Sequence, residues 1–108
     1  MSARALLVCL SLIISGHALA ENDNFLVFGI GLSSCAHWQS TPSRQREGAI
    51  WIYGYWSAAN HIADTQRQTG RHTDADGIVG EVKKVCDTRP SMGLVEAAGI
   101  AYFNLSKR

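Results

Sequence analysis

The residue types that could perform catalysis are scattered along this chain. Three of the four histidines, His37, His61 and His72, lie beyond residue 20, and none stands in an HExxH-like or CxxC-like arrangement that would hold a metal ion. Cys35 is two residues from His37, so an imidazole could in principle activate a thiol there. Oxidation of Cys35 to a disulfide would remove that chemistry. We therefore predict no catalytic residues and do not expect an enzyme.

Two short motifs resemble ligand-binding loops without completing them. Asp74, Asp76 and Gly77 look like the start of a calcium loop, but a third acidic or amide position and the later glutamate of an EF-hand are missing. Capping of a helix N-terminus explains both carboxylates better. Gly29 and Gly31 lack the third glycine of a phosphate-binding loop. The sequence therefore predicts neither a metal site nor a cofactor.

The elements that would position a site are organised around one apolar stretch, residues 49–59. It contains no charged or amide side chain and includes Trp51, Tyr55 and Trp56. A segment that is apolar nearly all round is typical of a buried helix, and this one is too short for a membrane span, which needs about 20 residues. Its alanines favour a helix over a strand. We predict a buried central helix over roughly residues 44–65.

The N-terminus has the pattern of a secretory signal peptide. Arg4 precedes the apolar run of residues 5–14, and Ala18-Leu19-Ala20 forms a cleavage site of the Ala-x-Ala type. We therefore expect residues 1–20 to be a signal peptide that directs export to the periplasm and is cleaved after Ala20. The apolar run is too short for a transmembrane anchor. The remaining single domain is small enough that its core alone gives only marginal stability.

The exported chain is expected to carry balanced charge. Removal of Arg4 lowers the 10 basic residues of the sequence by one, which then equals the 9 acidic residues. No basic stripe or polybasic cluster is present, so we expect no nucleic-acid binding and no stable membrane insertion. The expected partners are protein clients or one protein partner. The oligomeric state, including a homodimer, stays open.

Two cysteines remain after signal-peptide removal, Cys35 and Cys86. An exported protein folds in an oxidising compartment, and two cysteines allow a single intramolecular pairing. Closing a loop of about 50 residues would stabilise the fold by about 4 kcal/mol in the chain-entropy model. We predict this disulfide, the alternatives being free thiols or a bridge to another chain.

Capping residues and helical spacing predict four helices. Ser33 or Ser34 can cap a short helix over residues 35–39, which Pro42 ends or interrupts, and Ser43 can cap the central helix. The third helix begins at Thr73 with Asp76 in its first turn. Its core face is the stripe Ile78, Val79, Val82, Val85 and Cys86.

The last helix is predicted to open at Ser91 and to carry apolar residues at helical spacing from Leu94 to Leu105. Residues 21–32 are predicted to form an extended leader, because Gly29 and Gly31 weaken both helix and strand. Residues 33–108 form the helical domain. The predicted fold is a compact all-α bundle of about four helices with one disulfide.

Three motifs carry a resemblance to a known family. They are Cys35-Ala-His-Trp38, Gly54-Tyr-Trp56, and Val85-Cys86-Asp-Thr-Arg-Pro90. They are similar to the HdeA/HdeB-like family of small periplasmic proteins, whose pattern has a Cys opening a helix and an aromatic residue three positions later. A Gly-aromatic pair follows on a central helix, and a second Cys lies near the end of the third helix. The resemblance covers roughly residues 33–102.

This resemblance implies an all-α domain with the disulfide Cys35–Cys86. The best-known members are acid-stress chaperones, which expose apolar surface at low pH and hold unfolding proteins without ATP. The implied client-binding surface is the apolar side of the central helix, with Trp51, Tyr55 and Trp56. Falling pH would neutralise carboxylates and charge histidines. The groups concerned are Asp64, Asp74, Asp76, Asp87, Glu96, His37, His61 and His72.

A second resemblance leads to a different function. The helix with Gly54-Tyr55-x-x-Ala58, followed by a valine-rich helix, a proline and a final helix, resembles the Rap1a/Tai immunity proteins. Those proteins neutralise toxic effectors in the periplasm by direct binding. The alternative hypothesis is therefore a binding module with one protein partner.

Overall fold

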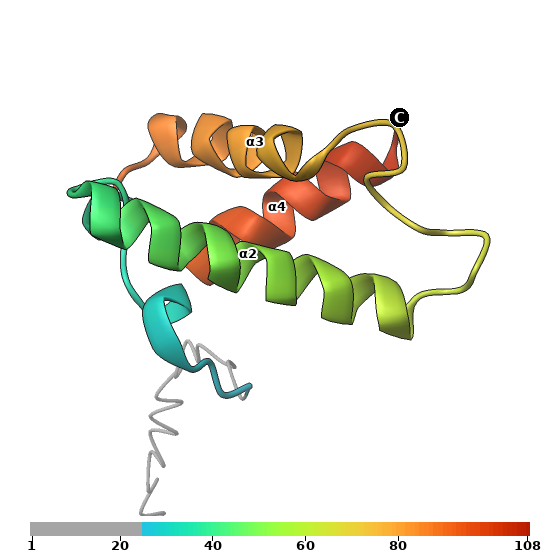
Figure 1. Ribbon diagram of the computed structural model, residues 1–108, viewed down its shortest axis with the longest axis horizontal. Helices are drawn as coiled ribbons and strands as arrows, with labels where there is room; N and C mark the ends of the chain where they lie inside the picture. Colours follow the sequence, from blue (N-terminus) through green and yellow to red (C-terminus); the bar gives the residue numbers. More distant parts are fainter. Residues whose placement is uncertain (1–24) are drawn as a thin grey trace, which may run out of the picture.

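Four α-helices and one short 3₁₀-helix form the part of the chain that the computed structural model describes, residues 25–108 (Figure 1). In chain order they are η1 (Gly29–Leu32), α1 (Cys35–Trp38), α2 (Pro42–Ile62), α3 (Ala75–Thr88) and α4 (Leu94–Ser106). Within these residues there is no β-strand, only an isolated bridge between Ser34 and Gly93. The predicted all-α fold is confirmed. The predicted signal peptide, residues 1–20, lies outside the described residues.

Helix α2 begins at Pro42, the residue that was expected to end or interrupt the short helix before it. The Thr41 hydroxyl accepts a hydrogen bond from the Arg44 backbone N–H at 3.1 Å, so Thr41 is the cap and the prediction of Ser43 was wrong. Proline suits the first helical position because its missing N–H would have no partner there. No helix of the described residues is both long and apolar enough to cross a membrane.

One face of α2 is buried and the other is exposed. Gly48, Ile52 and Trp56 face the core, whereas Ile50 and Ile62 are 70% and 85% exposed. The prediction of a helix buried all round was therefore wrong, because a domain this small has too few other elements to cover every face. Helix α4, which crosses between α2 and α3 in Figure 1, is the more buried element. Its buried residues are Leu94, Ala97, Ala98 and Ala101.

The starts of α3 and α4 also differ from the predicted caps. The Asp74 carboxylate, and not Thr73, caps α3 by accepting from the Gly77 backbone N–H at 2.8 Å. Helix α4 follows Gly93 without any side-chain cap. The first N–H of α4, from Leu94, donates to the Ser33 carbonyl at 2.8 Å. A backbone carbonyl from another segment therefore accepts this hydrogen bond, and the prediction that Ser91 caps the helix was wrong.

The predicted disulfide joins Cys35 at the start of α1 to Cys86 near the end of α3, with 5.4 Å between the Cα atoms. Both cysteines are fully buried. Trp38, also fully buried, donates its indole N–H to the Gln45 carbonyl at 3.1 Å. Gly48 faces this ring so closely that a Cβ would collide with it. The disulfide and Trp38 thus fix α1 against α2 and α3.

The end of the predicted extended leader, residues 21–32, is helical rather than extended. Residues 25–28 have no regular structure, but Gly29–Leu32 form the 3₁₀-helix η1, which contacts both α2 and α4. Ile30 is buried and anchors this turn, and Gly29 has a φ of 76°, which glycine adopts without strain. We call residues 25–28 the arm.

Candidate protein-binding groove

An open groove of about 630 Å³ lies between the arm and the helices α2 and α4. It is mainly apolar, and among residues 25–108 Glu96 is the one charged residue that lines it. The lining residues are Phe25, Leu26, Val27 and Phe28 of the arm, Trp51 and Tyr55 of α2, and Val95, Glu96 and Gly99 of α4. Three segments far apart in the sequence therefore build one surface, which we call the groove.

The α2 wall of the groove consists of two stacked aromatic rings. Trp51 and Tyr55 are one helical turn apart, so they lie on the same face of α2, and their ring centroids are 5.5 Å apart. The Trp51 indole N–H donates to the Phe28 carbonyl at 2.9 Å. Gly31 lies so close to the indole that a Cβ there would collide with it. Trp51 therefore joins α2 to both the arm and η1.

Helix α4 approaches Tyr55 closely because residue 99 is a glycine. A Cβ on Gly99 would lie 3.2 Å from the Tyr55 hydroxyl oxygen. Burial, and secondly the nearby Tyr102 phenol, raise the pKa of Tyr55 above its ordinary value. The Tyr55 phenol is thus neutral at physiological pH and offers the groove a hydroxyl rather than a charge.

The arm presents large apolar side chains to water. Phe25, Leu26 and Phe28 are 68%, 83% and 76% exposed, and all three also line the groove. Contiguous exposed apolar residues typically mark an interaction site. Residues 25–28 are all apolar in the sequence, but no sequence pattern indicates that Val95 and Gly99 of α4 face them.

The three residues predicted for a binding surface do not lie together. Trp51 and Tyr55 line the groove, whereas Trp56 is only 3% exposed and packs against Tyr102 with ring centroids 4.9 Å apart. The Trp56 indole N–H donates to the Thr69 carbonyl at 2.9 Å. Trp56 therefore supports the connection between α2 and α3 and does not reach the groove.

Ion pairs lie at both ends of the contact between α3 and α4. Arg89 pairs with Glu96 at 3.0 Å near the start of α4, and Arg108 pairs with Glu81 at 3.3 Å beyond its end. Lys84 also binds Glu81, at 3.1 Å. The hydrogen bond from Lys84, followed by the charge of Arg108, lowers the pKa of Glu81 against the opposing effect of burial.

The residues considered for catalysis form no catalytic pair. Cys35 is in the disulfide, so it cannot act as a thiol beside His37. Among residues 25–108, no group of three or more His, Cys, Asp or Glu side chains could hold a metal ion. Asp74 caps a helix, as predicted for this acidic pair in preference to calcium binding.

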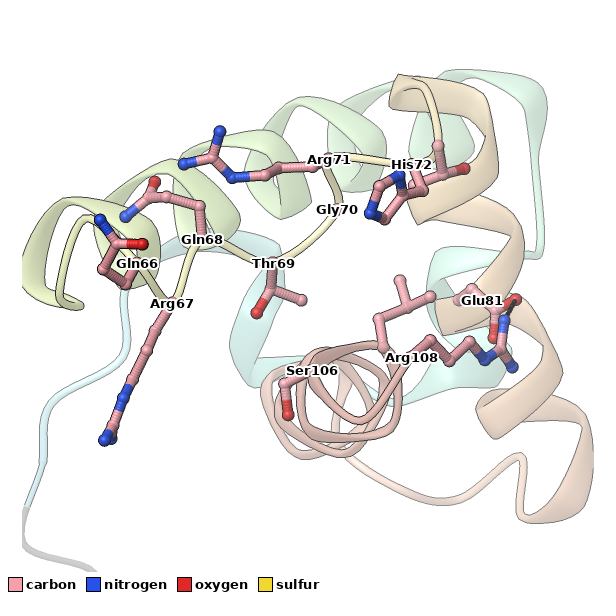
Figure 2. A pocket seen from close by; sticks show the side chains of 12 residues that line it. Gln66, Arg67, Gln68, Thr69, Gly70, Arg71, His72, Glu81, Ser106 and Arg108 are labelled. Atoms are coloured by element: carbon pink, nitrogen blue, oxygen red, sulfur yellow. Dashed lines mark hydrogen bonds and ion pairs between the residues drawn. The ribbon is translucent and has the colours of Figure 1, made fainter.

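A second cavity, of about 710 Å³, is polar and lies beside the connection between α2 and α3 (Figure 2). Residues 66–73 form one side of it, and Glu81, Leu105, Ser106 and Arg108 form the other. In Figure 2, Arg108 lies against Glu81, and Arg67 points away from the other labelled residues. Glu81 and Arg108 already neutralise each other, and Arg71 donates a hydrogen bond to the Thr65 carbonyl, so we place the candidate site in the apolar groove.

Comparisons with protein-family models, with curated proteins and with solved structures gave no match to this chain. The two resemblances therefore depend on the motif residues themselves. Of those, Cys35 and Cys86 form the disulfide, and Trp38 and Trp56 are core residues. Gly54 is exposed on α2 with no neighbour near it.

Proposed function

We propose that this protein is a small periplasmic, ATP-independent chaperone that holds unfolded polypeptide in the groove, as the HdeA/HdeB-like resemblance implies. The observation that carries the proposal is an open apolar groove next to an arm whose aromatic side chains stand in water. Burying one apolar side chain there would contribute about 1.5–3 kcal/mol, and unfolded chains offer many such side chains. Binding of this kind requires no nucleotide.

Acid is the proposed trigger because carboxylates hold both ends of the α3–α4 contact. Loss of the Glu81 charge in acid would release Arg108 and weaken the contact between α3 and the C-terminal end of α4, the helix that carries Val95 and Gly99. Such pairs are worth only about 0–1 kcal/mol each, so their loss loosens α4 without unfolding the disulfide-linked domain. The groove would then open further for clients.

The test measures dye binding, sedimentation and client light scattering with the oxidised protein between neutral pH and about pH 2, where carboxylates are protonated. We expect acid to expose apolar surface reversibly and the protein to suppress aggregation of an acid-labile client. Val95→Gln, which places an amide in the groove, should weaken this suppression. Ile62→Gln is the matched control, because Ile62 is 85% exposed at the far end of α2.

A protein that stays compact in acid while the client precipitates would contradict the chaperone proposal. The groove exists in the folded state, and this observation favours the second candidate, a binding module for one partner of the Rap1a/Tai type. A neutral-pH pull-down would test it, with Val95→Gln as the variant that should lose the partner.

A further inference from the structure

We infer that the arm is a displaceable wall of the groove, and that extended apolar client segments bind by taking its place on Trp51. The inference rests on the proposed function, because it describes how clients reach the holding site. Residues 25–28 would then regulate access to the groove, and the substrate class is polypeptide with an apolar segment in an extended conformation.

The arm is weakly attached to the helices. Within residues 25–108, the hydrogen bond from the Trp51 indole N–H to the Phe28 carbonyl, 2.9 Å long, is the one that joins the arm to another element. Phe25, Leu26 and Phe28 are mostly exposed, so each buries only a fraction of its apolar surface, and the three together hold the arm only weakly. Segments with few buried contacts open at low free-energy cost.

The chain beyond the arm is firmly held, which places the pivot at Gly29. Ile30 is buried, and the Ser33 carbonyl accepts the Leu94 N–H at 2.8 Å. Gly29 lies between the loose and the fixed parts, with a φ of 76° that other residues rarely adopt. Rotation there would lift the arm and leave η1 in place.

The arm itself indicates what can replace it. Phe28 has an extended backbone, with φ −115° and ψ 148°, and offers its carbonyl to the indole of Trp51. Any extended chain can present a carbonyl in the same way and place apolar side chains against Tyr55 and Val95.

The experiment measures binding of a lysine-flanked Phe-Leu-Val-Phe peptide to the full exported protein and to its variant Phe25→Ser/Leu26→Ser/Phe28→Ser. Because the wild-type groove binds only while the arm is off, the variant should bind the peptide about fivefold tighter. Peptide should also move the Trp51 indole NMR resonance of the wild type toward its position in the variant. Ile62→Ser, with an exposed residue outside the groove, should bind like the wild type.

Weaker peptide binding by the arm variant would overturn the inference, since it would make the arm a fixed part of the binding surface. An unmoved Trp51 resonance on peptide binding would overturn it as well. If the peptide binds neither protein while the wild type still suppresses client aggregation, the displacement mechanism is wrong and the proposed function stands. If the wild type also fails to suppress client aggregation, both the displacement mechanism and the proposed function are wrong.

Discussion

The side-chain amide of Asn60 pairs with both backbone groups of Thr69. The Asn60 Oδ1 atom accepts from the Thr69 N–H at 2.9 Å, and the Nδ2 atom donates to the Thr69 carbonyl at 3.0 Å. Tyr102 donates its hydroxyl to the same Oδ1 at 2.7 Å. One residue near the end of α2 therefore holds both the α2–α3 connection and α4.

Replacement of Asn60 should destabilise the fold through this connection. In Asn60→Ala the Thr69 N–H, on a residue only 5% exposed, loses its partner, so we expect a loss of about 1–3 kcal/mol in the free energy of unfolding. Urea denaturation followed by circular dichroism measures it. Ser57→Ala, on the exposed side of α2, should change little, and equal stabilities of the two variants would contradict the role of Asn60.

Loss of the disulfide should remove much of the stability of this small domain. The cysteines are 51 residues apart, so Cys35→Ala/Cys86→Ala should lower the free energy of unfolding by about 4 kcal/mol. Thermal unfolding of the oxidised wild type, the reduced wild type and the double variant measures the effect. Equal melting temperatures of the double variant and the oxidised wild type would show that the disulfide contributes nothing to stability.

Two glycines of α2 should respond oppositely to alanine. A Cβ at Gly48 would collide with Trp38, which is fully buried and hydrogen-bonded to Gln45, so Gly48→Ala should cost about 1–3 kcal/mol. Gly54 has no atom near its Cβ position, so Gly54→Ala should stabilise the helix by about 0.5–1 kcal/mol. Melting temperatures of both variants show whether each substitution stabilises or destabilises the fold. A destabilised Gly54→Ala would refute the argument from helix propensity.

The Glu81 carboxylate should stabilise the fold while it is ionised and lose this contribution in acid. Its pKa is lowered below the ordinary 4.5 by Lys84 and then Arg108, so its contribution is complete above that value and disappears as pH falls through the lower folded-state pKa. Glu81→Gln should therefore cost about 1 kcal/mol at pH 7 and almost nothing in strong acid.

Urea denaturation across pH compares Glu81→Gln with the wild type. Glu47→Gln is the control, because Glu47 is exposed on α2 and forms no ion pair among the described residues. A difference between Glu81→Gln and the wild type that persists at low pH would exclude the charge as its origin.

Much of the fold was predictable because its causes are local. Apolar spacing predicted α3 and α4, and the two cysteines beyond residue 20 could form only one internal disulfide. The predictions were wrong where contacts with residues distant in the sequence decided the structure. The Ser33 carbonyl serves the first N–H of α4, so Ser91 has no capping role, and exposure of Ile50 depends on how few helices cover α2.

The candidate site was less predictable for the same reason. Aromatic residues on α2 indicated a binding surface, and Trp51 and Tyr55 do line the groove. Trp56, the next residue after Tyr55, points about 100° away around the helix, because that is the angle between successive helical positions. Its indole therefore donates a hydrogen bond to the Thr69 carbonyl and does not line the groove. The pairing of the arm with Val95 and Gly99 comes from tertiary packing, for which the sequence holds no short-range pattern.

The disulfide divides the chain into a covalent ring, residues 35–86, and two tails. Helix α2 and the connection that follows it lie inside the ring, whereas the arm and α4 belong to the tails. A protease that cuts the α2–α3 connection would leave both pieces joined until a reductant is added. A cut at the arm would instead release a wall of the groove from an otherwise intact body. Proteolysis at the arm would therefore remove one wall of the groove and leave the helical fold intact.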